Sequence, residues 1–115
     1  MSQPYTEPAI YAFQRTLTAN QVLTDVSLII DRGEFVWTAI WGTQTGIYSV
    51  RFGLPSGTKI TSANLRNANM VGTAQFPVVI PPQLIRKNGA LVIDITDLSG
   101  AGNTIELCFA GYHQF

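Results

Sequence analysis

Apolar residues recur at every second position along most of this chain. Val26, Leu28 and Ile30 alternate with polar residues, and the same alternation returns in Leu91–Thr96 and Ile105–Ala110. A period of two places successive side chains on opposite faces of a β-strand, whereas an amphipathic helix needs a period near 3.6. The pattern therefore predicts an all-β chain without a long helix.

Turn-forming residues separate these short apolar segments. Arg32-Gly33, Pro55-Ser56-Gly57 and Asn88-Gly89 favour tight turns, because glycine accepts a positive φ and proline presets the first turn dihedral. About seven or eight short strands at such spacing are typical of a sandwich or small barrel. We predict one antiparallel β-sandwich or jelly-roll-like domain over residues 9–115. Residues 1–8, which contain two prolines, are predicted to form an extended N-terminal arm.

The last third of the chain has the clearest strand pattern. Leu91–Thr96 and Ile105–Ala110 flank a loop of small residues, Asp97–Asn103. We predict that these two strands pair with each other as an antiparallel hairpin. Upstream, Phe76–Ile80 is predicted to form a strand that ends at Pro81-Pro82, because proline lacks the N–H that a sheet ladder requires.

Charged residues are scarce. Seven basic and seven acidic residues give a formal net charge of zero, and charged residues make up 12% of the chain, about half the usual share of ~25%. A nucleic-acid-binding protein would need a basic stripe, and a polybasic membrane anchor would need clustered lysine and arginine. We therefore expect neither nucleic acid nor membrane as a partner. So few charges also predict that another molecule covers part of the surface.

Groups that could support catalysis are few. Cys108 and the single histidine, His113, are five residues apart, which places them on opposite faces of a continuous strand. Asp94 and Asp97 could form a carboxylate pair, but Asp97 opens a glycine-rich loop, where an aspartate ordinarily bonds its own backbone. Nearby loop oxygens could extend the pair into a calcium site, yet their spacing matches no calcium loop. We expect no catalytic residue, no metal and no cofactor.

Aromatic residues support one alternative function. Trp37, Trp41, Tyr48 and Phe52 could stack on sugar rings, which would make the chain a carbohydrate- or receptor-binding module. The competing interpretation is that these rings fill the core of a small sandwich, and we favour it.

Some strands are predicted to be apolar on both faces. In Glu34–Trp41 both the odd-numbered and the even-numbered positions are largely apolar, and Val78–Ile80 is apolar at consecutive positions. The outer face of such a strand must be covered by a loop, for example 62–75, or by another subunit. We favour a subunit contact. The predicted contact residues are Tyr5, Val36, Ile40, Val79, Tyr112 and Phe115.

Several segments together form a diffuse strand–loop–strand pattern. They are Leu17–Gln21, Ile30-Asp31, Phe35–Trp37, Pro81–Arg86, Leu91–Ser99 and Asn103–Leu107, followed by Gly111. This pattern resembles small β-sandwich virion proteins of tailed bacteriophages. The resemblance implies a non-enzymatic capsid decoration or cement protein on the capsid surface, made in the host cytoplasm. It also implies association with other copies, as a trimer, and with the major capsid protein. The alternative within this class is a neck or tail component, which would form a hexameric or dodecameric ring.

Overall fold

Strands account for most of the residues that the computed structural model describes, 6–114. One single-turn helix, α1 (Asn67–Met70), lies between the fifth and sixth strands. The prediction of an all-β chain is confirmed. The strands are β1 (Thr6–Leu17), β2 (Val22–Ile29), β3 (Glu34–Gln44), β4 (Tyr48–Gly53), β5 (Leu65–Arg66), β6 (Val78–Ile85), β7 (Ala90–Asp97) and β8 (Asn103–Gln114).

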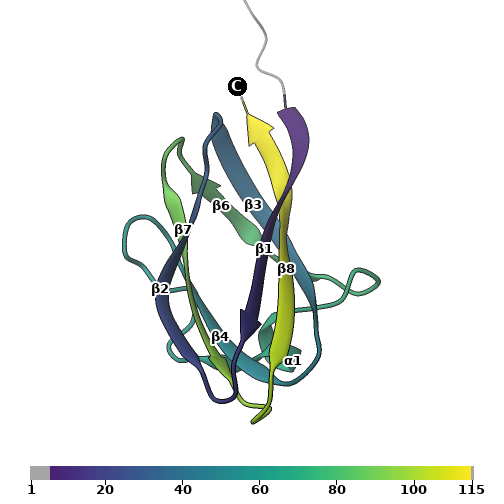
Figure 1. Cartoon of the computed structure of the whole chain (residues 1–115). Coiled ribbons are helices and arrows are strands. Elements are labelled where there is room, and N and C mark those ends of the chain that lie inside the picture. The colour runs from purple at the N-terminus through teal and green to yellow at the C-terminus, as the bar shows by residue number, and fades with distance from the viewer. Residues whose placement is uncertain (1–5, 115) are drawn as a thin grey trace, which may run out of the picture.

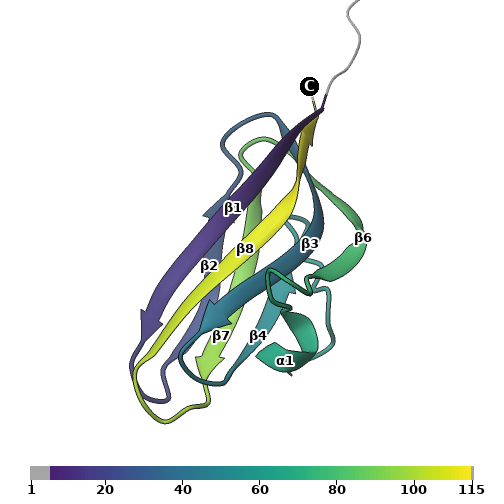
Figure 2. The same cartoon turned by 90° about the vertical axis from the view of Figure 1, so that its right-hand side faces the viewer.

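The strands form two four-stranded antiparallel sheets (Figure 1). Sheet A has the order β1-β8-β3-β6, and sheet B has the order β2-β7-β4-β5. Figure 2 shows sheet A in front of sheet B. Except at the β4–β5 connection, each strand is followed by a strand of the other sheet. The pairings β4–β5, β3–β6, β2–β7 and β1–β8 are all present, so strands pair symmetrically about that connection.

The core lies between the two sheets. Trp37 and Phe109 of sheet A meet Phe52 of sheet B, with ring centroids 5.3–5.6 Å apart in edge-to-face arrangements. All three side chains are fully buried. Burying a large apolar side chain contributes about 1.5–3 kcal/mol, and this cluster joins both sheets. The apolar residues that alternate along the strands are therefore the ones that both sheets bury in a shared core.

The predicted hairpin in the last third of the chain is wrong. β7 pairs with β2 and β4 in sheet B, whereas β8 pairs with β1 and β3 in sheet A. The loop between them crosses from one sheet to the other. Both strands turn an apolar face towards the same core, but from opposite sides. Local periodicity fixes which face is buried and leaves the pairing partner open.

The first described residues belong to a strand. Thr6, Glu7 and Pro8 pair with Gln114, His113 and Tyr112, so this part of the predicted arm at 1–8 is corrected. Proline is tolerated here because β1 is an edge strand with β8 as its one neighbour. The rest of the predicted arm, residues 1–5, lies outside the described residues.

The predicted end of a strand at Pro81-Pro82 is also corrected, because β6 continues through both prolines. Val79 pairs with Ala39 and Gln83 pairs with Trp37, so the residues between Val79 and Gln83 outnumber their counterparts in β3. The prolines lie in this bulge, on the edge strand of sheet A. A bulge and an edge are the two places in a sheet where a missing N–H is harmless.

Candidate interaction surface

The outer face of sheet A carries three consecutive cross-strand rows of apolar side chains. Residues directly opposite each other in antiparallel strands place their side chains on the same face. The strand register therefore defines this apolar face residue by residue. Its rows are Pro8–Tyr112–Val36–Leu84, Ile10–Ala110–Ala39–Val79 and Ala12–Cys108–Trp41.

The apolar face is accessible at both edges of the sheet. Ile10 is 60% exposed at the β1 edge, and Val79 is 77% exposed at the β6 edge. Val36 is 6% exposed, since Tyr112 and Leu84 lie on either side of it in its row. Apolar side chains that remain exposed together on a sheet face are typical of an interface.

Polar rows border the apolar face at both ends. Thr6, Gln114 and Glu34 form the row beyond Pro8, and Gln14, Glu106 and Thr43 form the row beyond Ala12. The amide of Gln14 donates to Glu106 Oε2 at 2.5 Å. An apolar centre with a hydrogen-bonded polar rim is the usual anatomy of a protein–protein contact.

A bulge in β3 decides which of its residues reach the apolar face. The pairing with β8 shifts register between Trp37 and Ala39. As a result Ile40 follows Trp37 on the core side and is fully buried, while Ala39 and Trp41 turn outward. The prediction that Ile40 faces outward is therefore wrong, because an extra residue in one strand reverses the alternation beyond it.

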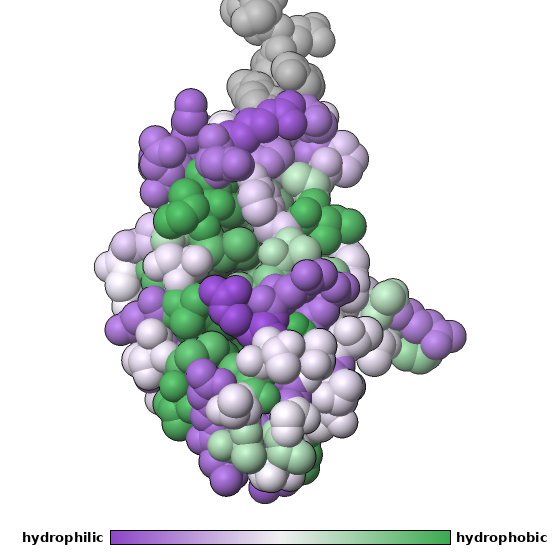
Figure 3. All heavy atoms as spheres, in the orientation of Figure 1, coloured by the Kyte–Doolittle hydropathy of each residue, from purple (hydrophilic) through white to green (hydrophobic). Residues whose placement is uncertain are grey.

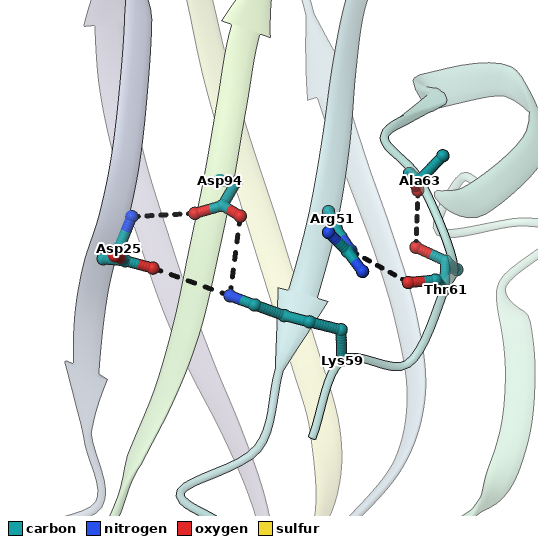
Figure 4. A network of polar contacts seen from close by, with 6 residues as sticks. All are labelled: Asp25, Arg51, Lys59, Thr61, Ala63 and Asp94. Atoms are coloured by element: carbon teal, nitrogen blue, oxygen red, sulfur yellow. Dashed lines mark hydrogen bonds and ion pairs between the residues drawn. The ribbon is translucent and has the colours of Figure 1, made fainter. Parts of the chain in front are cut away.

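The outer face of sheet B is different in kind. Its centre carries charged side chains, shown in Figure 4. Lys59 Nζ lies 3.5 Å from Asp25 Oδ1 and 3.5 Å from Asp94 Oδ2, and the Nε–H group of Arg51 donates to the backbone oxygen of Thr61 at 2.8 Å. These ion pairs keep the sheet B face solvated. The three central rows of sheet A contain no charged residue, whereas the outer face of sheet B combines these charges with the exposed Val22 and Ile29 of β2.

Asp97 organises the crossing between the two sheets. Its carboxylate accepts the hydroxyl of Ser99 at 2.6 Å, the backbone N–H groups of Asn20, Ser99 and Gly100, and the amide of Asn103. The Ser99 hydroxyl above all, against the opposing effect of burial, holds the pKa of Asp97 well below its ordinary value. The structural role predicted for Asp97 is confirmed.

The same geometry does not favour a calcium site at this loop. Donors surround the Asp97 carboxylate, and Asp94 belongs to the ion pairs on sheet B instead. Within residues 6–114 no group of three or more histidine, cysteine, aspartate or glutamate side chains is placed to hold a metal ion.

Cys108 and His113 lie on opposite faces of β8, as their spacing predicts. Cys108 is on the apolar face, where burial first and the charge of Glu106 second raise the pKa of its thiol. His113 is on the core side, and its Nε2 lies 3.0 Å from the hydroxyl of Tyr11. The thiol therefore has no imidazole beside it to act as a base.

Comparisons of the chain with protein-family models, with curated proteins and with solved structures found no match. Among the described residues, no helix is long and apolar enough to cross a membrane. The apolar face is therefore interpreted from its geometry alone.

Three of the six predicted contact residues lie on the apolar face: Val36, Val79 and Tyr112. Ile40 lies in the core, and Tyr5 and Phe115 are outside the described residues. Apart from Tyr112, the residues that β1 and β8 contribute to the apolar face are absent from the predicted contact set. The signal that could have identified them is the run of apolar residues at even-numbered positions in 8–12 and in 108–112. A period of two places the residues of each run on one face of its strand.

The aromatic residues considered for sugar binding divide between core and surface. Trp37, Tyr48 and Phe52 are fully buried, as the favoured interpretation predicts. Trp41 is half-buried on the apolar face beside Cys108. This face therefore lacks the several exposed tryptophan and tyrosine rings, among the described residues, that a sugar-stacking surface would need.

Proposed function

We propose that this chain is a non-enzymatic structural protein of a tailed-bacteriophage virion, a capsid decoration or cement protein. Its function is to stabilise the head by covering apolar surface between neighbouring subunits. The observation that carries the assembly role is the apolar face of sheet A, with its exposed residues Ile10, Val79 and Leu84. The placement in a virion rests on the sequence resemblance.

The fold we propose is a jelly roll, an eight-stranded sandwich built of two Greek keys. The support is the strand pairing, in which β4 pairs with β5, β3 with β6, β2 with β7 and β1 with β8. A long antiparallel ribbon folded at the β4–β5 connection has this pairing, and it forms a jelly roll when it rolls up. Both sheet orders, β1-β8-β3-β6 and β2-β7-β4-β5, follow from that rolling. Viral capsid proteins and lectins are among the proteins that use jelly rolls, so this fold agrees with the proposed function without establishing it.

The proposed partners are other copies of the chain and the major capsid protein. The resemblance implies three copies, and that number stays a prediction. The proposed location is the capsid surface, after synthesis in the host cytoplasm. A neck or tail position is the alternative that the same resemblance leaves.

The test uses matched pairs of aspartate substitutions on the two sheets. Val79→Asp with Leu84→Asp changes two exposed residues of the apolar face, on β6. Val22→Asp with Ile29→Asp changes two residues of comparable exposure on the outer face of sheet B. Each double variant is mixed with capsids that lack the protein, and co-sedimentation is measured.

We expect the wild-type chain and the sheet B variant to co-sediment with the capsids, and the sheet A variant to stay in the supernatant. Equal binding by both variants would contradict the apolar face as the contact. Failure of the wild-type chain to bind would contradict the decoration role. An electron-microscopy map of the intact particle would then show whether the protein lies at the neck or tail or is absent from the particle.

A further inference from the structure

Among the described strands, β1 is the one long edge strand without a bulge, and its single proline, Pro8, lies near its first residue. Edge strands expose a row of unpaired N–H and C=O groups, and proteins block them with bulges, prolines, charges or short length. The β6 edge has the Pro81-Pro82 bulge. The β5 edge has two residues. The β2 edge has an irregularity at Asp25, whose φ is +54°.

The β1 edge is regular over its whole length. Its pairing with β8 runs from Thr6 to Leu17 without a register shift, and residues 9–17 contain no proline. Figure 2 shows β1 as the outermost strand of sheet A, with β8 on its inner side. A second strand could therefore pair along most of this edge.

The charges of β1 match those of a second, antiparallel β1. This strand contains two charged residues: Arg15, and Glu7, whose carboxylate also accepts from Arg32 of the same chain at 2.8 Å. When two β1 strands pair about a two-fold axis at Tyr11, Glu7 of each copy lies opposite Arg15 of the other. A shift of the axis by one residue in either direction removes both matches. Opposite charges directly across an antiparallel pair are stabilising, and like charges are destabilising.

The same register matches the apolar side chains. It places Ile10 of one copy opposite Ala12 of the other, so the two apolar faces join into one. Eleven side chains on a strand lattice of about 4.8 Å by 6.8 Å cover roughly 360 Å². A stable interface needs about 800 Å² from each partner. One copy falls well short of this area, whereas two joined copies present roughly 720 Å² of apolar surface to a capsid.

The side of the molecule next to this edge is apolar as well. Figure 3 shows hydrophobic residues along the side where β1 and β2 face the viewer, below a hydrophilic upper end. Ala9 and Tyr11 of β1, with Leu23, Val26 and Leu28 of β2, are partly buried residues packed against the core. Pairing at β1 would bring this side of one copy towards the same side of the other.

We propose that two copies of this chain pair through antiparallel β1 edges centred on Tyr11, which extends sheet A into one eight-stranded sheet across a two-fold axis. This inference deepens the proposed self-association and rests on it, while its test needs no capsid. It commits to two copies, in place of the three that the resemblance implies.

Charge-swap variants test the pairing. Arg15→Glu gives a chain with glutamate at both positions, and Glu7→Arg gives a chain with arginine at both. Masses are measured by native mass spectrometry and light scattering at high micromolar concentration. We expect a wild-type mass twice that of the 12.6 kDa chain. Each single variant should raise the dissociation constant at least about tenfold, because two attractive pairs become repulsive.

The two single variants should restore each other. In an equimolar mixture every Glu–Arg match is regained, so a heterodimer is expected although each variant pairs only weakly with itself. A wild-type mass of one or three chains would overturn the proposal, as would a mixture that stays monomeric. Circular dichroism confirms that each variant is folded. Val79→Asp with Leu84→Asp is expected to stay dimeric, which separates a failure of this pairing from a failure of capsid binding.

Discussion

Ala39 of β3 lies directly opposite Ala110 of β8, at the middle of the central row of the apolar face. The row ends in the larger side chains of Ile10 and Val79, which are exposed at the two edges of sheet A. Methyl groups in the middle keep the face shallow. A flat or shallow apolar surface of this kind suits contact with another protein better than it suits enclosure of a small ligand.

Because of the bulge in β3, substitutions at two neighbouring apolar positions should change the free energy of unfolding by very different amounts. Ile40→Ala removes a fully buried side chain and should lower the free energy of unfolding by about 2–5 kcal/mol. Val79→Ala removes a side chain that is 77% exposed and should change it by about 0.5 kcal/mol or less. Urea unfolding of both variants measures the difference. Equal effects would mean that the face assignment beyond the bulge is wrong.

Gly111 is predicted to be irreplaceable because β3 approaches it closely. A Cβ atom at this position would lie 1.8 Å from the backbone oxygen of Val36, so Gly111→Ala requires the strands to separate. We expect a loss of about 3 kcal/mol or more in unfolding free energy. Gly102→Ala is the control, since its nearest neighbour would be the Leu17 oxygen at 4.0 Å. Thermal unfolding of both variants should show a large shift for the first and a small one for the second.

Asp97 should make stability depend on acid pH. Its folded-state pKa is lowered, chiefly by the Ser99 hydroxyl, from an ordinary value of 3.8. The stabilisation is therefore complete above that value and is lost as the pH falls towards the folded-state pKa. Urea midpoints measured from pH 7 down to pH 2 should decrease. In Asp97→Asn the midpoint should be lower at pH 7 and should change less with acid; an unchanged pH profile would contradict this role.

Cys108 should react slowly with alkylating reagents. Burial and the neighbouring Glu106 raise the pKa of its thiol, so less thiolate is present at a given pH. We expect the alkylation rate to increase with pH later than for an unperturbed thiol. Glu106→Gln should shift that increase to lower pH. On capsid binding, labelling of Cys108 should be suppressed, because this residue lies within the apolar face.

The Tyr48 hydroxyl is buried and has no hydrogen-bond partner among the described residues. Burial also raises the pKa of this phenol. Tyr48→Phe removes the hydroxyl but keeps the ring in the core, so stability should be unchanged or higher by about 1 kcal/mol. Tyr48→Ala, which also removes the ring, should cost about 3–5 kcal/mol. A clear loss in the phenylalanine variant would show that the hydroxyl is bonded in solution.

Period-two alternation was sufficient to predict the strand class, and it located the core side of Val26, Leu28 and most of β7 and β8. It failed where pairing depends on distant residues. β7 and β8 have the same local pattern as a hairpin, and their separation into two sheets follows from the core between them. The bulge at Thr38 has no simple local signature, so alternation alone places Ile40 on the wrong face. Pro81-Pro82 does signal an interruption of the ladder, but alternation does not distinguish a bulge from a strand end.

The candidate surface was predicted in outline. Consecutive apolar residues in Glu34–Trp41 and Val78–Ile80 pointed to a covered outer face, and Val36 and Val79 do lie there. The larger part of the face comes from β1 and β8, which are 86 residues or more apart in the pairing that joins them. A single sequence contains the apolar pattern of each strand but not the register between strands.

The two prolines of β6 have a consequence for how far sheet A can grow. A sheet with two open edges can add copies at both and lengthen without limit, as in fibrils. Here one edge is interrupted by the bulge and the other is used once a partner has paired. Assembly through backbone hydrogen bonds is then self-limiting, and a closed particle of few copies is its end point. Replacing Pro81 and Pro82 would risk an open-ended polymer.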